Sequence, residues 1–131
     1  MKYKIYSKEE ITEYNKNPFV VRIIRNRFIE YDNVFKLWCV FQRKKYPEKT
    51  CRNIFSEAGF NVNLMNSKLP QARIKNWEDN YLKYGYDYFI TSKKFIQLKN
   101  NLINDISVII DDKSKLKIKI YNEVLKELKN V

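Results

Sequence analysis

The sequence predicts a mainly α-helical fold with one small β-hairpin near its start. Apolar residues recur at helical spacing in several stretches, and prolines and glycines separate most of those stretches. The stretch 19–31 differs, because it is rich in Val, Ile and Phe and is interrupted by two arginines and an asparagine. A chain of 131 residues that is 44% hydrophobic has enough apolar material for one packed domain, or for a core domain with a helical appendage.

The first predicted helix begins just after Ser7. Ser7 and Glu10 have the spacing of a capping box, in which each side chain bonds to the other residue's backbone N–H. We expect the helix to end before Pro18, because the residue preceding a proline avoids helical geometry. The stretch 19–31 then predicts a β-hairpin with Asn26 in its turn. A helix continuing through that stretch is the alternative interpretation.

A helix over 34–46 is predicted next, with Asp32 or Asn33 as its N-cap. Apolar side chains at helical spacing form its expected buried face: Val34, Leu37, Trp38 and Phe41. Its last turn is basic, which suits the negative end of the helix dipole: Arg43, Lys44 and Lys45.

Pro47 is expected to open a second helix at its first position, where proline is well tolerated. This helix is expected to run to about Ala58, with Gly59 ending it just after the C-cap. Its apolar side consists of Cys51, Ile54, Phe55 and Ala58. Phe60 is expected to fold back onto the core, and 61–66 to form a short helical turn or loop.

A third helix is expected to extend from a cap at Asn66 or Ser67 to Tyr84, and Gly85 closes it. Pro70 is tolerated in its first turn. The expected buried stripe consists of Ile74, Trp77, Tyr81 and Tyr84. Its helical spacing favours core packing for these aromatic residues over stacking on nucleic-acid bases.

Two further amphipathic patterns follow residue 86 and predict a C-terminal helical hairpin. The first stripe consists of Phe95, Leu98, Leu102, Ile106 and Ile109. The second stripe consists of Leu116, Ile120, Val124 and Leu128. The polar stretch 111–114 marks the turn between them. Because 116–120 also alternates apolar and basic residues, a strand is the alternative there.

These elements divide the chain into three parts. Residues 1–33 form an N-terminal helix and β-hairpin, 34–85 form a three-helix core, and 86–131 form a C-terminal helical extension that is a candidate dimerisation element. The middle part combines a helix, a proline-led helix, a glycine turn and an aromatic-anchored helix. That order is typical of a three-helix helix-turn-helix unit.

The charge of the chain favours a polyanionic partner. It has 26 basic and 15 acidic residues, a net charge of +11. Abundant Lys, Asn, Ile and Tyr are also typical of an AT-rich genome, so part of this charge has a compositional explanation. The arginines are more informative, because all six fall in one span: Arg22, Arg25, Arg27, Arg43, Arg52 and Arg73. Their planar side chains suit phosphates and base edges.

Several segments together resemble a known family. They are Asn17-Pro18-Phe19-Val20, the β-rich stretch and aromatic helix that follow, Ile54-Phe55-Ser56-Glu57-Ala58-Gly59-Phe60, and Arg73-Ile74-Lys75-Asn76-Trp77. In this combination the chain resembles small helix-turn-helix proteins from Clostridia and their relatives. Those proteins in turn resemble the first-frame DNA-binding proteins of insertion-sequence transposons. The resemblance covers about half of the chain and explains nothing after about Tyr86.

The resemblance implies a sequence-specific double-stranded DNA-binding protein, either a transcriptional regulator or a mobile-element DNA-binding protein. It makes 69–84 the recognition helix and 48–58 the supporting helix. The residues implied to face the bases are Gln71, Arg73, Lys75, Asn76 and Asn80. Those implied to contact phosphates are Lys49, Arg52, Arg43, Lys44 and Lys45. Arg22, Arg25 and Arg27 would add a second strip along the DNA backbone.

Glu78 and Asp79 depart from the family pattern, in which the positions after the tryptophan tend to be basic. Two carboxylates would be repelled by phosphate if they pointed at the groove. Either they face sideways, or the protein is a phage- or mobile-element-encoded interaction module that binds another protein without DNA. A single-strand or RNA binder is a third interpretation, although the chain contains no known RNA-binding motif.

The composition argues against an enzyme. The chain has no histidine, the commonest general base, and its two glycines are too few for a phosphate-binding loop. Cys39 and Cys51 lack the spacing of metal ligands, so we expect reduced core thiols. We therefore expect no catalytic residues, no metal and no cofactor.

The chain is expected to be cytoplasmic, without membrane association. Its longest apolar runs, such as 34–41 and 106–110, are too short to span a membrane, and the first residues do not resemble a secretory signal. The apolar stripes after Phe95 suggest a homodimer. A dimer would place two recognition helices on half-sites about one helical turn apart.

Overall fold

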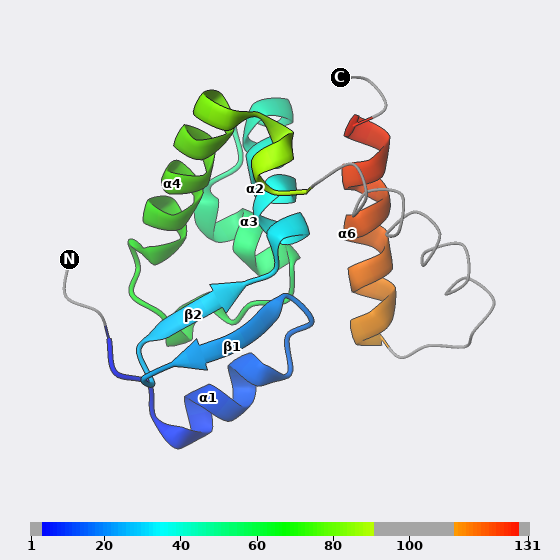
Figure 1. Ribbon diagram of the computed structural model, residues 1–131. Helices are drawn as coiled ribbons and strands as arrows, with labels where there is room; N and C mark the ends of the chain where they lie inside the picture. Colours follow the sequence, from blue (N-terminus) through cyan, green and yellow to red (C-terminus); the bar gives the residue numbers. More distant parts are fainter. Residues whose placement is uncertain (1–3, 91–111, 129–131) are drawn as a thin grey trace.

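The computed structural model describes residues 4–90 and 112–128 (Figure 1). Helix α2 (Asn33–Lys45) lies between α4 (Leu69–Tyr84) and α6 (Asp112–Leu128) and packs against both. The other elements are α1 (Lys8–Asn15), β1 (Val20–Ile24), β2 (Phe28–Tyr31), α3 (Cys51–Glu57), and the 3-10 turns η1 (Val62–Leu64) and η2 (Tyr86–Tyr88). The predicted mainly α-helical fold with one small β-hairpin is confirmed.

The first helix and the hairpin follow the sequence closely. The Ser7 hydroxyl accepts a hydrogen bond from the Glu10 backbone N–H at 3.1 Å, and the Glu10 carboxylate accepts one from the Ser7 N–H at 2.9 Å. Both halves of the capping box therefore form. β1 and β2 pair antiparallel, with Ile23 opposite Ile29 and Ile24 opposite Phe28. The alternative of a continuous helix is wrong.

An aromatic cluster forms the centre of the core, and Phe35 is its hub. The Phe35 side chain is fully buried, and its ring centroid lies 5.2 Å from that of Phe19, 5.5 Å from Phe55 and 5.8 Å from Trp77. These rings come from the hairpin entry, α2, α3 and α4. A single apolar centre thus holds four elements together, because each ring contacts rings from its neighbours.

Asn17 joins the two most distinctive sequence segments. Its buried side chain donates a hydrogen bond to the Ala58 carbonyl at 2.9 Å and accepts one from the Phe19 backbone N–H at 2.8 Å. Gly59 follows with a φ of +86°, where a Cβ atom would lie 3.4 Å from the Asn17 Nδ2 and 3.2 Å from Leu116 Cδ2. The predicted glycine after the second core helix is therefore needed for both conformation and space.

The prediction that Pro47 opens the second core helix is wrong. α3 begins at Cys51, and the Thr50 hydroxyl caps it by accepting from the Asn53 backbone N–H at 3.1 Å. Pro47 instead lies in the connection, where the Lys49 N–H donates to the Tyr46 carbonyl at 3.0 Å. The hydroxyl cap explains the later start, since it satisfies a backbone N–H that has no partner inside the helix.

Two expectations about the third core helix are also wrong. Its N-cap position is Lys68, without a side-chain cap. Asn66 accepts from the Lys68 backbone N–H at 2.9 Å and so forms a turn before the helix rather than its cap. Tyr84 is 59% exposed instead of buried, and its ring stacks on Tyr88 with centroids 5.1 Å apart. Ile74 and Trp77 are buried as predicted.

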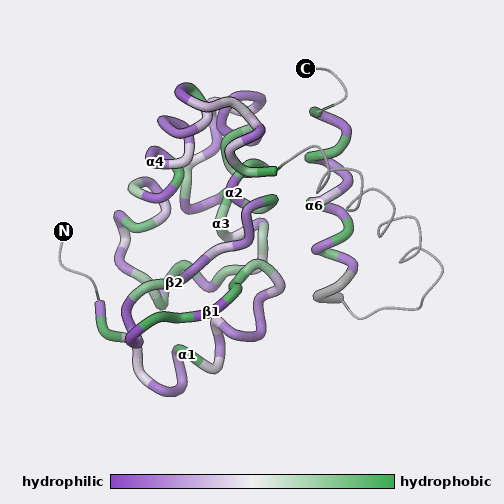
Figure 2. The backbone as a smooth tube through the Cα atoms, in the orientation of Figure 1, coloured by the Kyte–Doolittle hydropathy of each residue, from purple (hydrophilic) through white to green (hydrophobic). Residues whose placement is uncertain are grey.

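The C-terminal segment packs onto the core through α6. Ile120 and Val124 are buried against the core, while hydrophilic positions alternate with them along the helix (Figure 2). The strand alternative for 116–120 is therefore wrong. The first stripe of the predicted helical hairpin, 95–109, lies outside the described residues. Within the part of the chain that is described, no helix combines the length and apolar character that a membrane crossing needs.

Candidate nucleic-acid interface

Helix α4 presents a fixed outer face because its inner face is locked in the core. Ile74 and Trp77 are 0% and 3% exposed, and the Trp77 ring stacks on Phe55 with centroids 6.1 Å apart. These anchors determine which side of the helix faces outward. The exposed polar residues on its first half are Gln71, Lys75 and Asn76, preceded by exposed Lys68. The sequence did not predict Lys68 as a site residue, because the cap of this helix was expected at Asn66 or Ser67.

Arg73 and Asn80 are less available than expected. Both are half-buried. The Nε atom of Arg73 is buried and has no hydrogen-bond partner among the described residues. The guanidinium lies close enough to Tyr31 to oppose, by its positive charge, the rise that burial causes in the Tyr31 pKa. Arg73 therefore extends along the core instead of standing out from α4, and it is a poorer base contact than Lys75 or Gln71.

Lys49 forms the centre of an internal polar network rather than a free phosphate contact. Its ammonium donates to Gln42 Oε1 at 3.0 Å and to Glu57 Oε1 at 3.0 Å, and it lies 4.4 Å from the centroid of the Tyr46 ring. The Arg43 guanidinium donates to the backbone carbonyl of Lys49 at 2.9 Å. These two cations hold the connection between α2 and α3 in place.

The remaining basic residues predicted to contact phosphates divide into two groups. Lys45 forms an ion pair with Glu127 at 3.2 Å, and Arg52 donates to Asn63 Oδ1 at 3.2 Å. Lys44 is exposed, has no ion pair with a described residue, and lies 5.9 Å from the centroid of the Tyr81 ring on α4. Of the five residues predicted to contact phosphates, Lys44 is thus the one that is both unpaired among the described residues and next to α4.

Two of these lysines line a cleft beside the C-terminal helix. A cleft of about 440 Å³ lies between α2 and α6, and Lys45 and Lys49 are among its lining residues. Since α6 and α4 lie on opposite sides of α2 (Figure 1), the Lys45 ammonium, which pairs with Glu127 on α6, is turned away from α4. The ion pair between Lys45 and Glu127 could not be predicted from the sequence, because the two residues are far apart in the chain.

Glu78 is less exposed than its neighbour Asp79 and lies near enough to α3 for its charge to affect Cys51. Its side chain is half-buried, and its negative charge reaches the thiol of Cys51 on α3. Burial raises the pKa of the Cys51 thiol, the Arg43 charge lowers it, and the Glu78 charge raises it. Asp79 is exposed on the second half of α4. Both carboxylates of α4 therefore lie after its first half, and the segment 68–76 contains none.

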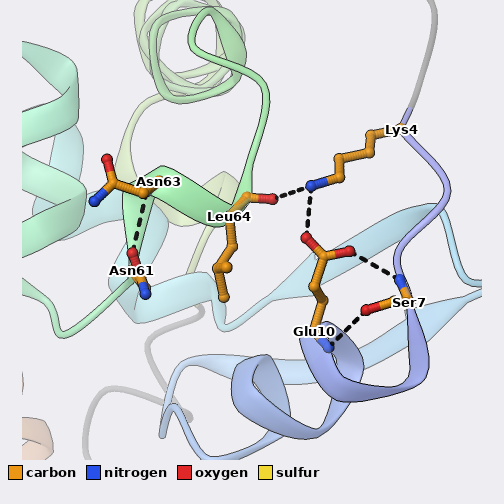
Figure 3. A network of polar contacts seen from close by, with 6 residues as sticks. All are labelled: Lys4, Ser7, Glu10, Asn61, Asn63 and Leu64. Carbon is orange, nitrogen blue, oxygen red and sulfur yellow. Dashed lines mark hydrogen bonds and ion pairs between the residues drawn. The ribbon is translucent and has the colours of Figure 1, made fainter.

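The N-terminal segment contacts both the hairpin turn and the approach of α4, and Figure 3 shows the second of these contacts. The Lys4 ammonium donates to the Leu64 backbone carbonyl in η1 at 2.7 Å and also pairs with Glu10 at 2.5 Å. The Tyr6 backbone N–H donates to the Asn26 carbonyl in the hairpin turn at 2.8 Å. Sequence reasoning missed this connection, because nothing in the pattern of residues 4–6 indicates a partner.

The described residues contain no group of three or more His, Cys, Asp or Glu side chains placed to hold a metal ion. Cys39 is a buried free thiol and Cys51 a half-buried one. No family model, no curated protein and no solved structure matches the chain.

Proposed function

We propose that this protein binds double-stranded DNA through the first half of α4, with α3 as the supporting helix of a helix-turn-helix-like unit. The observation that carries this proposal is a helix whose inner face is fixed in the core and whose first half, 68–76, contains no carboxylate. Gln71, Lys75 and Asn76 are exposed there, and Lys68 precedes them. Glutamine and asparagine pair with adenine, and lysine bonds to guanine or to phosphate.

The position of the acidic residues agrees with this mode of binding. Recognition helices contact base edges mainly through their N-terminal residues. The acidic residues Glu78 and Asp79 follow in the second half, where Glu78 is half-buried. Binding by the first half of α4 therefore avoids placing a carboxylate in the groove.

The proposed contact set differs from that implied by the family resemblance. Base contacts are assigned to Gln71, Lys75 and Asn76, while Arg73 supports the helix from the core side. Phosphate contacts are assigned to Lys44 and Lys68, since Lys45 and Lys49 are engaged in ion pairs. The connection 58–68 contains η1 and is longer than the three- or four-residue turn typical of the motif. By its resemblance, the protein would serve as a transcriptional regulator or a mobile-element DNA-binding protein.

A specific surface feature favours protein binding as the second candidate function. Leu82 is 82% exposed in the last turn of α4, and the exposed Tyr84 and Tyr88 that follow it in the chain stack on each other. Exposed aromatic and aliphatic side chains in one place are typical of protein-binding patches. This patch lies at the opposite end of α4 from the proposed base contacts, so base contact and protein binding would use different parts of the helix.

Fluorescence anisotropy with a short random-sequence duplex tests the DNA proposal. The wild-type affinity should fall steeply as salt rises, because phosphate contacts release counterions. The variant Gln71→Ala/Lys75→Ala should bind severalfold more weakly and with a salt slope smaller by about 0.9, since the loss of Lys75 removes one cation from the interface. Both side chains are exposed, so the fold should be retained.

The matched control is Lys115→Ala/Lys126→Ala on α6, whose side chains are exposed across α2 from α4. It removes two positive charges where the α4 variant removes one. Wild-type affinity in this control would assign the effect to α4 rather than to net charge. Equal weakening in both variants, or no binding at low salt, would contradict the proposal.

A further inference from the structure

The turn of the β-hairpin contains an arginine in an unfavourable backbone conformation. Arg25 has a φ of +54° and Asn26 a φ of +58°, and the Arg27 N–H donates to the Ile24 carbonyl at 3.1 Å. Two successive positive φ angles are typical of a type I′ turn, where Asn and Gly are strongly preferred. Arginine rarely adopts this conformation, and such outliers concentrate at functional sites.

The fold itself makes no use of the turn arginines. Arg25 and Arg27 are exposed, and neither forms an ion pair with a described residue. Arg22, on the outer face of β1, differs because it is paired with Glu30 on β2. The two turn arginines are therefore free to meet an external anion.

Apolar side chains flank these cations at the end of the hairpin. Ile24 and Phe28 lie opposite each other across the two strands, on the outer face, and are 40% and 36% exposed. A narrow tip that combines arginines with adjacent apolar side chains has the chemistry of proteins that bind the DNA minor groove. There, arginine meets the enhanced negative potential of A·T-rich sequence, and apolar groups contact the sugar walls or base steps.

The turn is held on the same side of the molecule as the start of α4. The Tyr6 N–H bonds to the Asn26 carbonyl, and two residues earlier the Lys4 ammonium bonds to the Leu64 carbonyl, just before α4 begins (Figure 3). Residues 4–6 span at most about 10 Å. Neighbouring major and minor grooves are about half a helical turn apart, roughly 17 Å. The connection is therefore short enough to keep the hairpin turn and the approach to α4 on one side of a duplex, where the tip can reach the groove next to the one that α4 occupies.

We propose that the hairpin tip, defined as residues 24–28, inserts Arg25 and Arg27 into the minor groove next to the major groove that α4 occupies. The inference rests on the proposed function and adds to it a second contact with a preference for A·T-rich duplex. The Tyr6–Asn26 and Lys4–Leu64 contacts tie the hairpin turn to the approach of α4.

The test measures the affinity of the full chain for two duplexes that differ in the minor groove alone. One duplex is alternating A·T; in the other, 2,6-diaminopurine replaces adenine, which adds an amino group in the minor groove and leaves the major-groove edges unchanged. Wild type should bind the second duplex about tenfold more weakly. The variant Arg25→Asn/Arg27→Gln should bind the first duplex about tenfold more weakly, discriminate little between the two, and show a salt slope smaller by about 1.8.

Thermal unfolding of the same variant separates a binding role from a structural one. Asparagine is preferred over arginine at positive φ, so Arg25→Asn/Arg27→Gln should unfold at the same temperature as wild type or higher. The control Arg22→Gln removes a paired arginine from the same hairpin and should keep the discrimination between duplexes. Weaker binding by a more stable variant is not explained by loss of folding.

The other outcomes overturn the inference in distinguishable ways. Wild-type binding that ignores the added amino group, with the arginine variant still weakened, would place the hairpin on phosphates outside the groove. Wild-type affinity in Arg25→Asn/Arg27→Gln, with Gln71→Ala/Lys75→Ala weakened, would remove the hairpin and leave the proposed function standing. No binding to either duplex at low salt would remove both.

Discussion

The hydroxyl of Tyr121 donates a hydrogen bond to the carboxylate of Asp32 at 2.9 Å, which attaches the C-terminal helix to the first turn of α2. The same Asp32 oxygen accepts from the Phe35 backbone N–H at 3.2 Å and so caps α2. Further along both helices, the Trp38 indole N–H donates to Glu123 at 2.6 Å. The C-terminal helix is thus part of the core assembly, although the sequence left its position open.

Replacing Tyr121 with phenylalanine should destabilise the protein by about 1–2 kcal/mol, because the ring stays while a hydrogen bond to a charged group is lost. Urea unfolding followed by circular dichroism measures this change. Tyr88→Phe is the control, since that side chain is 55% exposed and has no hydrogen bond with a described residue. Equal stability of Tyr121→Phe and Tyr88→Phe would show that the Asp32 contact contributes nothing.

Asn17→Ala should be one of the most destabilising polar substitutions in the chain. It leaves the Ala58 carbonyl and the Phe19 N–H without their partners in a buried place, at a cost of about 2–3 kcal/mol. Chemical unfolding measures the loss, and exposed Asn15 at the end of α1 provides the matched Asn→Ala control. If both variants lost the same small amount, the bridge from the hairpin entry to α3 would not be a stabilising feature.

Alkaline pH should unfold the protein through its buried tyrosines. Burial is the main cause that raises the pKa of Tyr14, Tyr31 and Tyr121 above the ordinary value of 10.0. The folded state therefore holds these protons more tightly than the unfolded state does. The contribution of these tyrosines to stability should be constant at pH values well below 10 and fall as the pH rises above 10, as the unfolded chain ionises first.

Ultraviolet absorbance of tyrosinate during a pH titration checks this prediction. Exposed tyrosines such as Tyr84 and Tyr88 should ionise first, followed by a cooperative second phase that coincides with loss of helical circular dichroism. A single phase near the ordinary tyrosine pKa, with the helical signal retained, would contradict the burial of the three rings.

The expected homodimer depends on surfaces that α6 does not supply. Ile120 and Val124 of its apolar stripe are 1% and 0% exposed within one chain. Light scattering at micromolar concentration tests the dimer. A mass of about twice 16.0 kDa would support two-fold binding to paired half-sites. A mass equal to that of one chain would remove the dimer and predict a single, non-palindromic binding site.

The sequence correctly predicted several helix caps and turns, which depend on residues close together in the chain. The Ser7–Glu10 capping box, the Asp32 cap, the turn at Asn26 and the positive φ of Gly59 all involve neighbours within a few residues. The start of α3 was mispredicted because two local signals competed. Proline permits the first position of a helix, but the Thr50 hydroxyl supplies a hydrogen bond that Pro47 does not.

The candidate site was less predictable, because pairing at a distance decides which cations are free. Lys45 and Lys49 look equivalent to Lys44 in the sequence, yet Glu127 and Glu57 engage the first two. Arg73 lies at the border between the buried and exposed faces of α4, so the helical spacing did not determine whether it is exposed. In the structure its Nε is buried. The outward face of α4 was predictable from Ile74 and Trp77, since buried anchors at helical spacing define the opposite face.

The most direct measurement of the central claim is the change in backbone amide chemical shifts when a duplex is added to the isotope-labelled full chain. The account predicts that the largest changes fall in two segments, 68–76 at the start of α4 and 24–28 at the hairpin tip, with α6 unaffected. Changes confined to α6 or to the exposed Leu82–Tyr88 end of α4, or no changes at low salt, would contradict it.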